Sequence, residues 1–233
     1  AGPMEIAPTT HYMMGGARVD AESGATTRPG LFAAGEVAGG MHGANRLGGN
    51  SLSDLLVFGQ RTGAAAAAAA AGESDVPWVS PFQVGDAMKE IEAPLERASG
   101  EDPYRIQADL QATMQSLVGI FRIESDLDEA IGKLVELRRR LATVRVEGER
   151  AYNPGWNLVT ELRNLLLVSE AVARSARLRT ESRGAHSRLD FPDADPEWGK
   201  VNCVTTRDGD GVRVETAPVP ELPSELGALA GRG

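Results

Sequence analysis

The sequence is poor in the residues that build disulfides and metal centres. Its 233 residues include a single cysteine, Cys203, and three histidines. One cysteine can form neither an internal disulfide nor a structural zinc site, which favours a reducing compartment. Because no H-x-x-x-H pair is present either, we expect no metal site, and we interpret Cys203 as an ordinary buried or strand thiol.

Basic residues and long apolar runs are also scarce. There are 24 Lys and Arg against 33 Asp and Glu, which gives a net charge of −9 and a pI near 5.0. A chain that binds nucleic acid needs a basic face, so this balance argues against such a partner. No run of about 18 apolar residues occurs, so we expect no direct membrane insertion. The opening stretch, AGPMEIAPTT, lacks the features of a signal peptide and is typical of the interior of a longer protein.

Three common catalytic patterns are missing. The chain has no G-x-S-x-G serine-hydrolase elbow, no P-loop lysine followed by Ser or Thr, and no G-x-G-x-x-G dinucleotide turn. These absences argue against a serine hydrolase or a P-loop nucleotidase. The usual phosphate-binding turn of a dinucleotide cofactor is therefore expected either to be missing from this fold or to lie in a part that precedes this chain.

The most informative stretch runs from Gly35 to Gly63, GEVAGGMHGANRLGGNSLSDLLVFGQRTG. Its glycines let the backbone pass close to a ligand, and the start of the following helix offers free N–H groups to negative charge. Arg46 carries a planar guanidinium that grips a carboxylate through two parallel hydrogen bonds. His42 lies in the same loop, and His11 lies in THYMMGG beside another glycine pair. The pattern indicates an anion site beside a large cofactor.

Hydrophobic spacing predicts the elements around this loop. Residues 30–35 form an apolar run between glycines and predict a buried strand, and Ser51 with Asp54 predicts a capped helix that extends to Gly72. Beyond a linker at 73–81, four amphipathic helices are expected. Their starts are marked at Asp102-Pro103, at Asn153-Pro154, and by Ser125 with Asp128. Their core faces are predicted to be Val84, Met88, Ile91 and Leu95; Ile106, Leu110, Met114, Leu117 and Phe121; Ile123, Leu127, Ile131, Leu134, Leu137, Leu141 and Val144; and Leu158, Leu162, Leu165 and Val172.

These elements predict an α+β fold: short strands, a glycine-rich loop and a long helix, followed by a helical bundle and a short C-terminal β segment. The expected divisions are 1–72, a linker at 73–81, the bundle at 82–190, and a β hairpin with a tail at 191–233. The hairpin is predicted by the alternation from Val201 to Val214 around the turn sequence DGDG.

Several stretches together resemble the flavoprotein subunit of succinate dehydrogenase and fumarate reductase, in the FAD-dependent oxidoreductase 2 family. They are, in chain order, HY with GG at 11–16, GLFAAGEVA at 30–38, HGANRLGGNSL at 42–52 and ESRGAH at 181–186. The resemblance covers about residues 8–218 and corresponds to the C-terminal part of such a subunit. It implies an oxidoreductase of electron transport and the tricarboxylic acid cycle, which transfers hydride between succinate or fumarate and FAD.

The resemblance also implies roles for individual residues. His11 and Arg46 would bind the two carboxylates of the substrate. Glu36 would hydrogen-bond a hydroxyl of FAD, and the start of the helix, at 50–52, would face the pyrimidine end of the flavin. The cofactor-binding set is therefore Glu36, Asn50, Ser51 and Leu52. A helix N-terminus there would stabilise the negative charge that a reduced flavin carries.

Other parts of the family are expected upstream of this chain. They are the glycine turn for the FAD diphosphate, the histidine that can carry FAD, the capping region and the arginine that donates the proton. We therefore expect no catalytic residue in this portion, an inactive isolated chain, and exposed apolar surface along residues 31–58 where the rest of the flavin domain would pack. The implied partners are an iron–sulfur subunit and membrane anchor subunits, which would hold the protein at the cytoplasmic face of the cell membrane.

Two alternatives remain open on the sequence alone. L-aspartate oxidase shares HY-x-x-GG and HGANR, although LGGNSLSD at 47–54 is closer to the dehydrogenase type. A chain of another class, a non-catalytic helical interaction module, would keep these motifs without using them.

Overall fold

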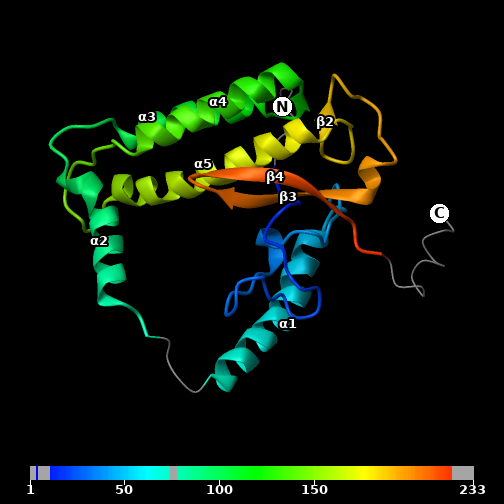
Figure 1. Ribbon diagram of the computed structural model, residues 1–233, viewed down its shortest axis with the longest axis horizontal. Helices are drawn as coiled ribbons and strands as arrows, with labels where there is room; N and C mark the ends of the chain where they lie inside the picture. The colour runs from blue at the N-terminus through cyan, green and yellow to red at the C-terminus, as the bar shows by residue number, and fades with distance from the viewer. Residues whose placement is uncertain (1–3, 5–10, 74–77, 222–233) are drawn as a thin grey trace. The chain divides into compact units, whose positions relative to one another are not determined.

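The computed structural model describes residues 4, 11–73 and 78–221 (Figure 1). The chain divides into two compact units, residues 1–80 and 81–233. The described elements, in chain order, are η1 (Gly35–Val37), α1 (Asn50–Gly72), α2 (Pro81–Glu96), α3 (Pro103–Leu117), β1 (Phe121–Arg122), α4 (Glu124–Leu141), α5 (Pro154–Leu178), β2 (Ser187–Arg188), η2 (Trp198–Lys200), β3 (Val201–Asp208) and β4 (Gly211–Pro218). This mixture of helices and short strands confirms the expected α+β class.

The N-terminal unit is built from irregular segments and one long helix. Residues 30–35 are not the buried strand that the sequence predicts. Phe32 forms only an isolated bridge with Ala25, and Leu31 is 55% exposed. An apolar run forms a strand only if a neighbouring strand pairs with its backbone N–H and C=O groups. The described residues of this unit offer only isolated bridges.

Helix α1 begins at Asn50 and is not capped by Ser51 with Asp54, as the sequence predicts. Its N-cap residue is Gly49, which has a φ of 83° and makes no side-chain cap. Glycine, which has no Cβ, adopts a left-handed φ of this kind without steric strain. The Asp54 side chain is instead buried, and it forms hydrogen bonds with side chains elsewhere in the unit.

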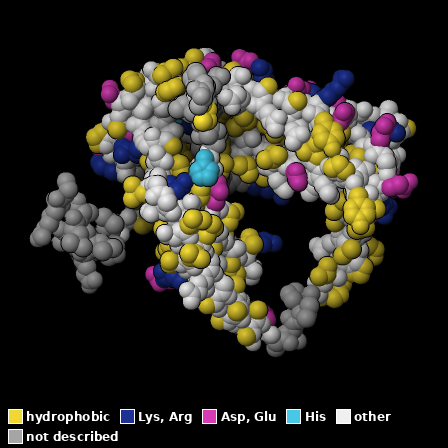
Figure 2. All heavy atoms as spheres, turned by 180° about the vertical axis from the view of Figure 1, so that it is seen from behind, with side chains coloured by type: hydrophobic (Ala, Val, Ile, Leu, Met, Phe, Trp, Pro, Cys, Tyr) yellow, Lys and Arg dark blue, Asp and Glu magenta, His cyan; other side chains and the backbone are white. Residues whose placement is uncertain are grey.

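A broad apolar surface on this unit is exposed, as expected for residues 31–58. Figure 2 shows hydrophobic side chains along the exposed face of α1. The members of this surface are Leu31 (55%), Val37 (61%), Leu47 (74%), Leu52 (68%), Leu55 (51%), Leu56 (75%) and Val57 (50%).

The C-terminal unit has its core between α3, α4 and α5, which run beside one another in Figure 1. Leu127, Leu134 and Leu162 are fully buried there. The predicted caps of α3 and α5 are confirmed: Asp102 accepts from the Tyr104 N–H at 2.9 Å, and Asn153 accepts from the Trp156 N–H at 3.1 Å.

Three predictions about the core of the bundle are wrong. Val84, Met88 and Ile91 on α2 are 49%, 48% and 41% exposed, and Leu165 on α5 is 46% exposed. Phe121 is 65% exposed, because α3 ends at Leu117 and Phe121 lies in strand β1 instead of continuing the helix face. Helical spacing identifies an apolar face, but burial also needs a neighbour. Among the described residues of the C-terminal unit, α2 packs against the core near its end, at Leu95.

The predicted cap of α4 is also wrong. Neither Ser125 nor Asp128 caps the helix, whose N-cap residue is Ile123 without a side-chain bond. Ser125 contacts Asp126, and Asp128 pairs with Arg177 of α5 at 2.8 Å. An arginine on a packed neighbouring helix is a stronger partner for this carboxylate than a backbone N–H.

The predicted hairpin is confirmed. Strands β3 and β4 pair in antiparallel register from Val201↔Pro218 to Asp208↔Gly211, and Gly209 in the two-residue turn has a φ of 56°. The hairpin lies along α5 (Figure 1), and Arg138 of α4 donates to the Asp210 carbonyl at 2.7 Å. It is thus part of the C-terminal unit. The sequence also predicts a loose tail from Thr216; this is wrong at its start because β4 continues to Pro218, and the part beyond residue 221 lies outside the described residues.

Candidate functional site

The site of the N-terminal unit forms where the segment at 11–17 lies against the glycine-rich loop. The Ala17 N–H donates to the Val37 carbonyl at 2.7 Å, and the Gly39 N–H donates to the Ala17 carbonyl at 3.0 Å. A Cβ on Gly16 would collide with the Val37 carbonyl, so this close approach requires glycine. The two segments therefore present their side chains to one place.

Tyr12, His42 and Asp54 form a contact cluster at this place. The Tyr12 hydroxyl donates to Asp54 Oδ2 at 3.1 Å. His42 Nε2 lies 3.3 Å from the same carboxylate oxygen and 3.3 Å from the Tyr12 hydroxyl. The side chains of His42 and Asp54 are only 8% and 5% exposed. A polar cluster this well shielded from water holds its geometry firmly.

The protons of the cluster can be assigned from its donors and acceptors. Burial raises the pKa of Tyr12 above its ordinary value, and the hydrogen bond to Asp54 raises it further. The phenol is therefore protonated at neutral pH, and its one proton points to Asp54. Because that proton is used, the contacts of His42 Nε2 with both oxygens require this nitrogen to carry its own hydrogen.

Arg46 lies over the face of the same tyrosine. Its Cζ is 4.7 Å from the centre of the Tyr12 ring, a cation–π distance. One guanidinium nitrogen, Nη1, donates to the Leu47 carbonyl at 3.3 Å. Arg46 Nε is buried and has no hydrogen-bond partner among the described residues, and Arg46 forms no ion pair within them. Within the part of the chain that the structure describes, the guanidinium is thus positioned without an acidic partner.

The other residues predicted to bind substrate or FAD lie near this cluster in the chain. The ring of His11 meets the ring of Tyr12 edge-on, with centres 6.4 Å apart, and His11 is exposed. Glu36 is exposed, and one of its carboxylate oxygens accepts from the Met13 N–H at 2.9 Å. The predicted residues of the helix start, 50–52, form the first turn of α1, with Ser51 half-buried and Leu52 68% exposed.

Two residues of the cluster are missing from the set that the sequence predicts as functional. Tyr12 stands out in the sequence only as part of the HY pair, and the spacing of Asp54 predicts a helix cap. The available signal is the position of Asp54 in the run SLSDLLVF, where one carboxylate stands among apolar residues. Such a carboxylate must find a partner if its face is buried.

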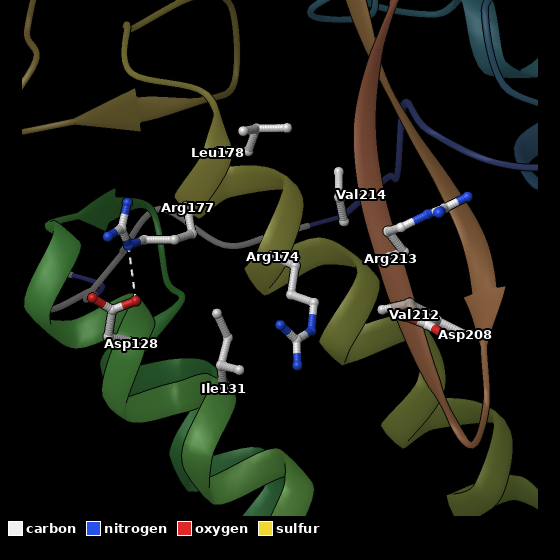
Figure 3. Close-up of a pocket in the computed structure, with 9 residues that line it drawn as sticks. All are labelled: Asp128, Ile131, Arg174, Arg177, Leu178, Asp208, Val212, Arg213 and Val214. Carbon is white, nitrogen blue, oxygen red and sulfur yellow. Dashed lines mark hydrogen bonds and ion pairs between the residues drawn. The ribbon is translucent and has the colours of Figure 1, made fainter.

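The C-terminal unit has a cavity of about 530 Å³ between α4, α5 and the hairpin (Figure 3). Three arginines line it, but Arg174 is paired with Glu170 and Arg177 with Asp128, while Asp208 also faces the space. These charges largely balance one another. We therefore place the candidate site at Arg46, whose charge is not matched among the described residues.

Two family models match the chain. Residues 107–224 match the one described as "Fumarate reductase flavoprotein C-term", and residues 2–52 match the one described as "FAD binding domain". The chain belongs to the succinate dehydrogenase/fumarate reductase flavoprotein family.

Among the described residues no group of three or more potential metal ligands occurs. None of the described helices is long and apolar enough to cross a membrane.

Individual relatives in this family are similar over most of the chain. The fumarate reductase flavoprotein subunit of Mycobacterium tuberculosis is 42% identical over 92% of this chain and 38% of its own length. The corresponding flavoprotein of Escherichia coli fumarate reductase is 36% identical over 93% of this chain and 37% of its own length. The chain thus spans little more than a third of these curated relatives.

Solved structures show the same relationship. The Mycobacterium smegmatis Sdh1 complex in the apo form aligns with a TM-score of 0.86 and 50% identity, covering 96% of this chain and 39% of its own. Quinol fumarate reductase from E. coli aligns with a TM-score of 0.86 and 34% identity, covering 95% of this chain and 39% of its own. The fold of this flavoprotein chain is therefore that of the C-terminal part of its relatives.

Proposed function

We propose that this chain is the C-terminal part of an FAD-dependent flavoprotein subunit that interconverts succinate and fumarate. The observation that carries the proposal is Arg46. Its guanidinium is held against Tyr12, its Nε is buried, and neither a carboxylate nor another acceptor for Nε is found among the described residues. A buried donor without a partner is costly, so the arrangement is explained if a ligand completes it.

The ligand that fits best is a carboxylate. A guanidinium binds a carboxylate through two parallel N–H···O bonds, which fixes orientation as well as charge. We propose that His11, whose ring meets the Tyr12 ring edge-on, binds the second carboxylate of the substrate. A dicarboxylate held at both ends would have its central carbon–carbon bond fixed in position, which lowers the entropic part of the barrier to hydride transfer.

Arg46 would also act electrostatically during the reaction. Hydride addition to fumarate places negative charge on the carbon next to a carboxylate, and charge can spread into that carboxylate. A fixed guanidinium at the carboxylate stabilises this charge without reorganising. The arginine that completes the reaction by donating a proton is expected in the part of the relatives that this chain does not span.

The residues expected to hold FAD fit the cofactor in two respects. The exposed Glu36 carboxylate uses one oxygen on the Met13 N–H, which leaves lone pairs for a cofactor hydroxyl. Gly49, the N-cap residue of α1, makes no side-chain cap. The N–H groups of Asn50 and Leu52 already donate to the Leu47 and Gly49 carbonyls, so the N–H group of Ser51 is the one in this set that can face an acceptor. FAD, when bound, would accept or supply the hydride.

The assembly of the whole protein belongs to the same proposal. One similar structure carries the words "Quinol-Fumarate Reductase with Menaquinol Molecules". By analogy we propose that an iron–sulfur subunit receives the electrons and that membrane anchor subunits hold the complex at the cytoplasmic face of the membrane. Because the chain spans little more than a third of its relatives, we expect the isolated chain to be inactive.

An Arg46→Lys substitution in the complete subunit tests the proposal. Lysine keeps the charge but not the two-pronged geometry, so succinate-dependent flavin reduction should fall about 100-fold or more. Arg61→Lys is the matched control, because Arg61 pairs with Glu22 at an exposed position of the same unit. Unchanged flavin reduction in the Arg46 variant would contradict the proposal. Peroxide formation that depends on aspartate, rather than on succinate, would identify L-aspartate oxidase instead.

A further inference from the structure

The buried carboxylate of Asp54 has no role in the function proposed above. It caps no helix, and its ion pairs within the described residues are limited to His42. Burying a carboxylate whose side chain is 5% exposed costs free energy of folding. A function for Asp54 would explain why the fold accepts this cost. Among the described residues, the side chain of Asp54 has two hydrogen-bonding partners, the hydroxyl of Tyr12 and the imidazole of His42. The explanation for its position must therefore lie with these two residues.

Tyr12 connects this carboxylate to Arg46. The hydroxyl end of the ring is fixed by Asp54 and His42, and the face of the ring carries the guanidinium. The ring of His42 adds an edge contact, with its centre 5.3 Å from that of Tyr12 at an interplanar angle of 78°. The tyrosine is therefore held on two sides and presents one defined face.

The carboxylate also affects the strength of the contact between Arg46 and the ring. An O–H group that donates to a carboxylate is polarised, and electron density moves into the aromatic ring. A more electron-rich face attracts a cation more strongly. Asp54 can in this way strengthen the hold on Arg46 without pairing with it directly, so that the N–H groups other than the one that Nη1 donates to the Leu47 carbonyl stay available for another anion.

We propose that Tyr12, His42 and Asp54 form a positioning relay that holds the Arg46 guanidinium in the orientation needed to bind a substrate carboxylate. The inference rests on the proposed function, because it assigns these three residues to the arginine that grips the substrate. Tyr12 supports the guanidinium, Asp54 anchors the tyrosine hydroxyl, and His42 fixes the carboxylate. A direct pair between Asp54 and Arg46 would instead occupy the donors that the substrate needs.

The experiment measures binding of malonate to the FAD-loaded complete subunit by calorimetry. Tyr12→Phe keeps the aromatic face and removes only the anchored hydroxyl. It should weaken malonate binding about tenfold, which corresponds to about 1.4 kcal/mol and is of the size expected for one hydrogen bond to a charged group. In an Arg46→Lys background, where the fork is already lost, the same change should have less than about a twofold effect.

Asp54→Asn provides the second variant, because it removes the charge while keeping an acceptor of the same shape for the tyrosine. It should show the same dependence on Arg46. Glu22→Gln is the matched control and should leave malonate binding unchanged, because this glutamate lies in an exposed ion pair with Arg61.

The outcomes separate the two proposals. If Arg46→Lys itself leaves malonate binding intact, the proposed function fails and the relay fails with it. If Arg46→Lys weakens binding but Tyr12→Phe and Asp54→Asn do not, or weaken it equally with Arg46 and with lysine at position 46, only the relay is overturned. Effects that disappear in the lysine background support the relay, because a general loss of structure would act in both backgrounds.

Discussion

Asp190 accepts a hydrogen bond at 2.8 Å from the backbone N–H of Glu124, the first residue of helix α4. The two residues are 66 positions apart in the sequence. The same side chain pairs with Arg188, whose guanidinium is completely buried. One carboxylate thus serves as the N-terminal cap of a helix and as the counter-charge of a buried arginine.

Replacing this carboxylate should destabilise the C-terminal unit. Asp190→Ala removes a cap and leaves the charge of Arg188 buried without its partner, so we expect a loss of about 3 kcal/mol in the free energy of unfolding. Asp190→Asn keeps an acceptor for the helix and should lose less. Urea denaturation provides the measurement, and Ser125→Ala, at the position where the sequence suggested a cap, should change stability by less than about 0.5 kcal/mol. Equal effects at the two positions would contradict this assignment.

Stability should also fall in acid through Glu181. Burial alone would raise the pKa of this carboxyl, but hydrogen bonds from Arg183 at 2.9 Å, from the Asp195 N–H and from Arg179 lower it to about 2. Since the folded pKa lies below the ordinary value of 4.5, the contribution is fully present above pH 4.5 and is lost as the pH falls toward 2. We expect that loss to be on the order of 2 kcal/mol.

Comparing stability at pH 6 and pH 3 for Glu181→Gln and for the unchanged chain tests this expectation. The glutamine variant should be less stable at pH 6 and should lose less on acidification. Part of the acid sensitivity should remain, because the hydrogen bond from Arg188 also lowers the pKa of Asp190 to about 2. Glu215→Gln, which changes an exposed carboxyl of the hairpin, should leave the pH dependence unaltered.

The carboxylate of Glu170 lies between the guanidinium groups of Arg138 and Arg174 and is 1% exposed. Glu170→Gln should leave two arginine charges facing each other and cost about 3 kcal/mol of unfolding free energy, near the low end for such pairs because both arginines reach solvent. Glu136→Gln is the control, since Glu136 forms an exposed pair with Arg139. Thermal unfolding that shifts equally in the two variants would contradict the structural role of Glu170.

Leu134 and Leu165 provide a test of which apolar positions form the core. Leu134 is completely buried on α4, so Leu134→Ala should cost about 2–5 kcal/mol, whereas Leu165 is 46% exposed and Leu165→Ala should cost less than about 1 kcal/mol. Denaturant midpoints of the two variants measure the difference. A cost for Leu165→Ala as large as that for Leu134→Ala would show that this face of α5 is covered in the folded protein.

The sequence predicted those features whose cause is local. The caps Asp102 and Asn153 depend on a side chain two or three residues from its donor, and the hairpin depends on the glycine in its turn. The buried stripe of α4 follows from helical spacing. Each of these requires only the neighbouring residues, so a single sequence suffices.

The features that the sequence did not predict depend on partners far along the chain. Asp54 looked like a cap because its spacing from Ser51 fits one, and its real partners lie 42 and 12 residues away. Asp190 and α4 are further apart still. For the site, the residues predicted to bind substrate remain predictions. The sequence could suggest Arg46 from its glycine-rich surroundings, but not the tyrosine beneath it, because the face of a ring is determined only by the fold.

The pairing of β1 with β2 has a consequence for biosynthesis. Phe121 and Arg122 form parallel partners with Ser187 and Arg188, so the connection between α3 and α4 is completed by residues made much later. Strands this short hold together only within a larger packed structure. While the ribosome is still adding α5, the nascent α3–α4 pair therefore lacks both its third helix and the β1–β2 pairing. During this interval its core leucines would be exposed and accessible to chaperones.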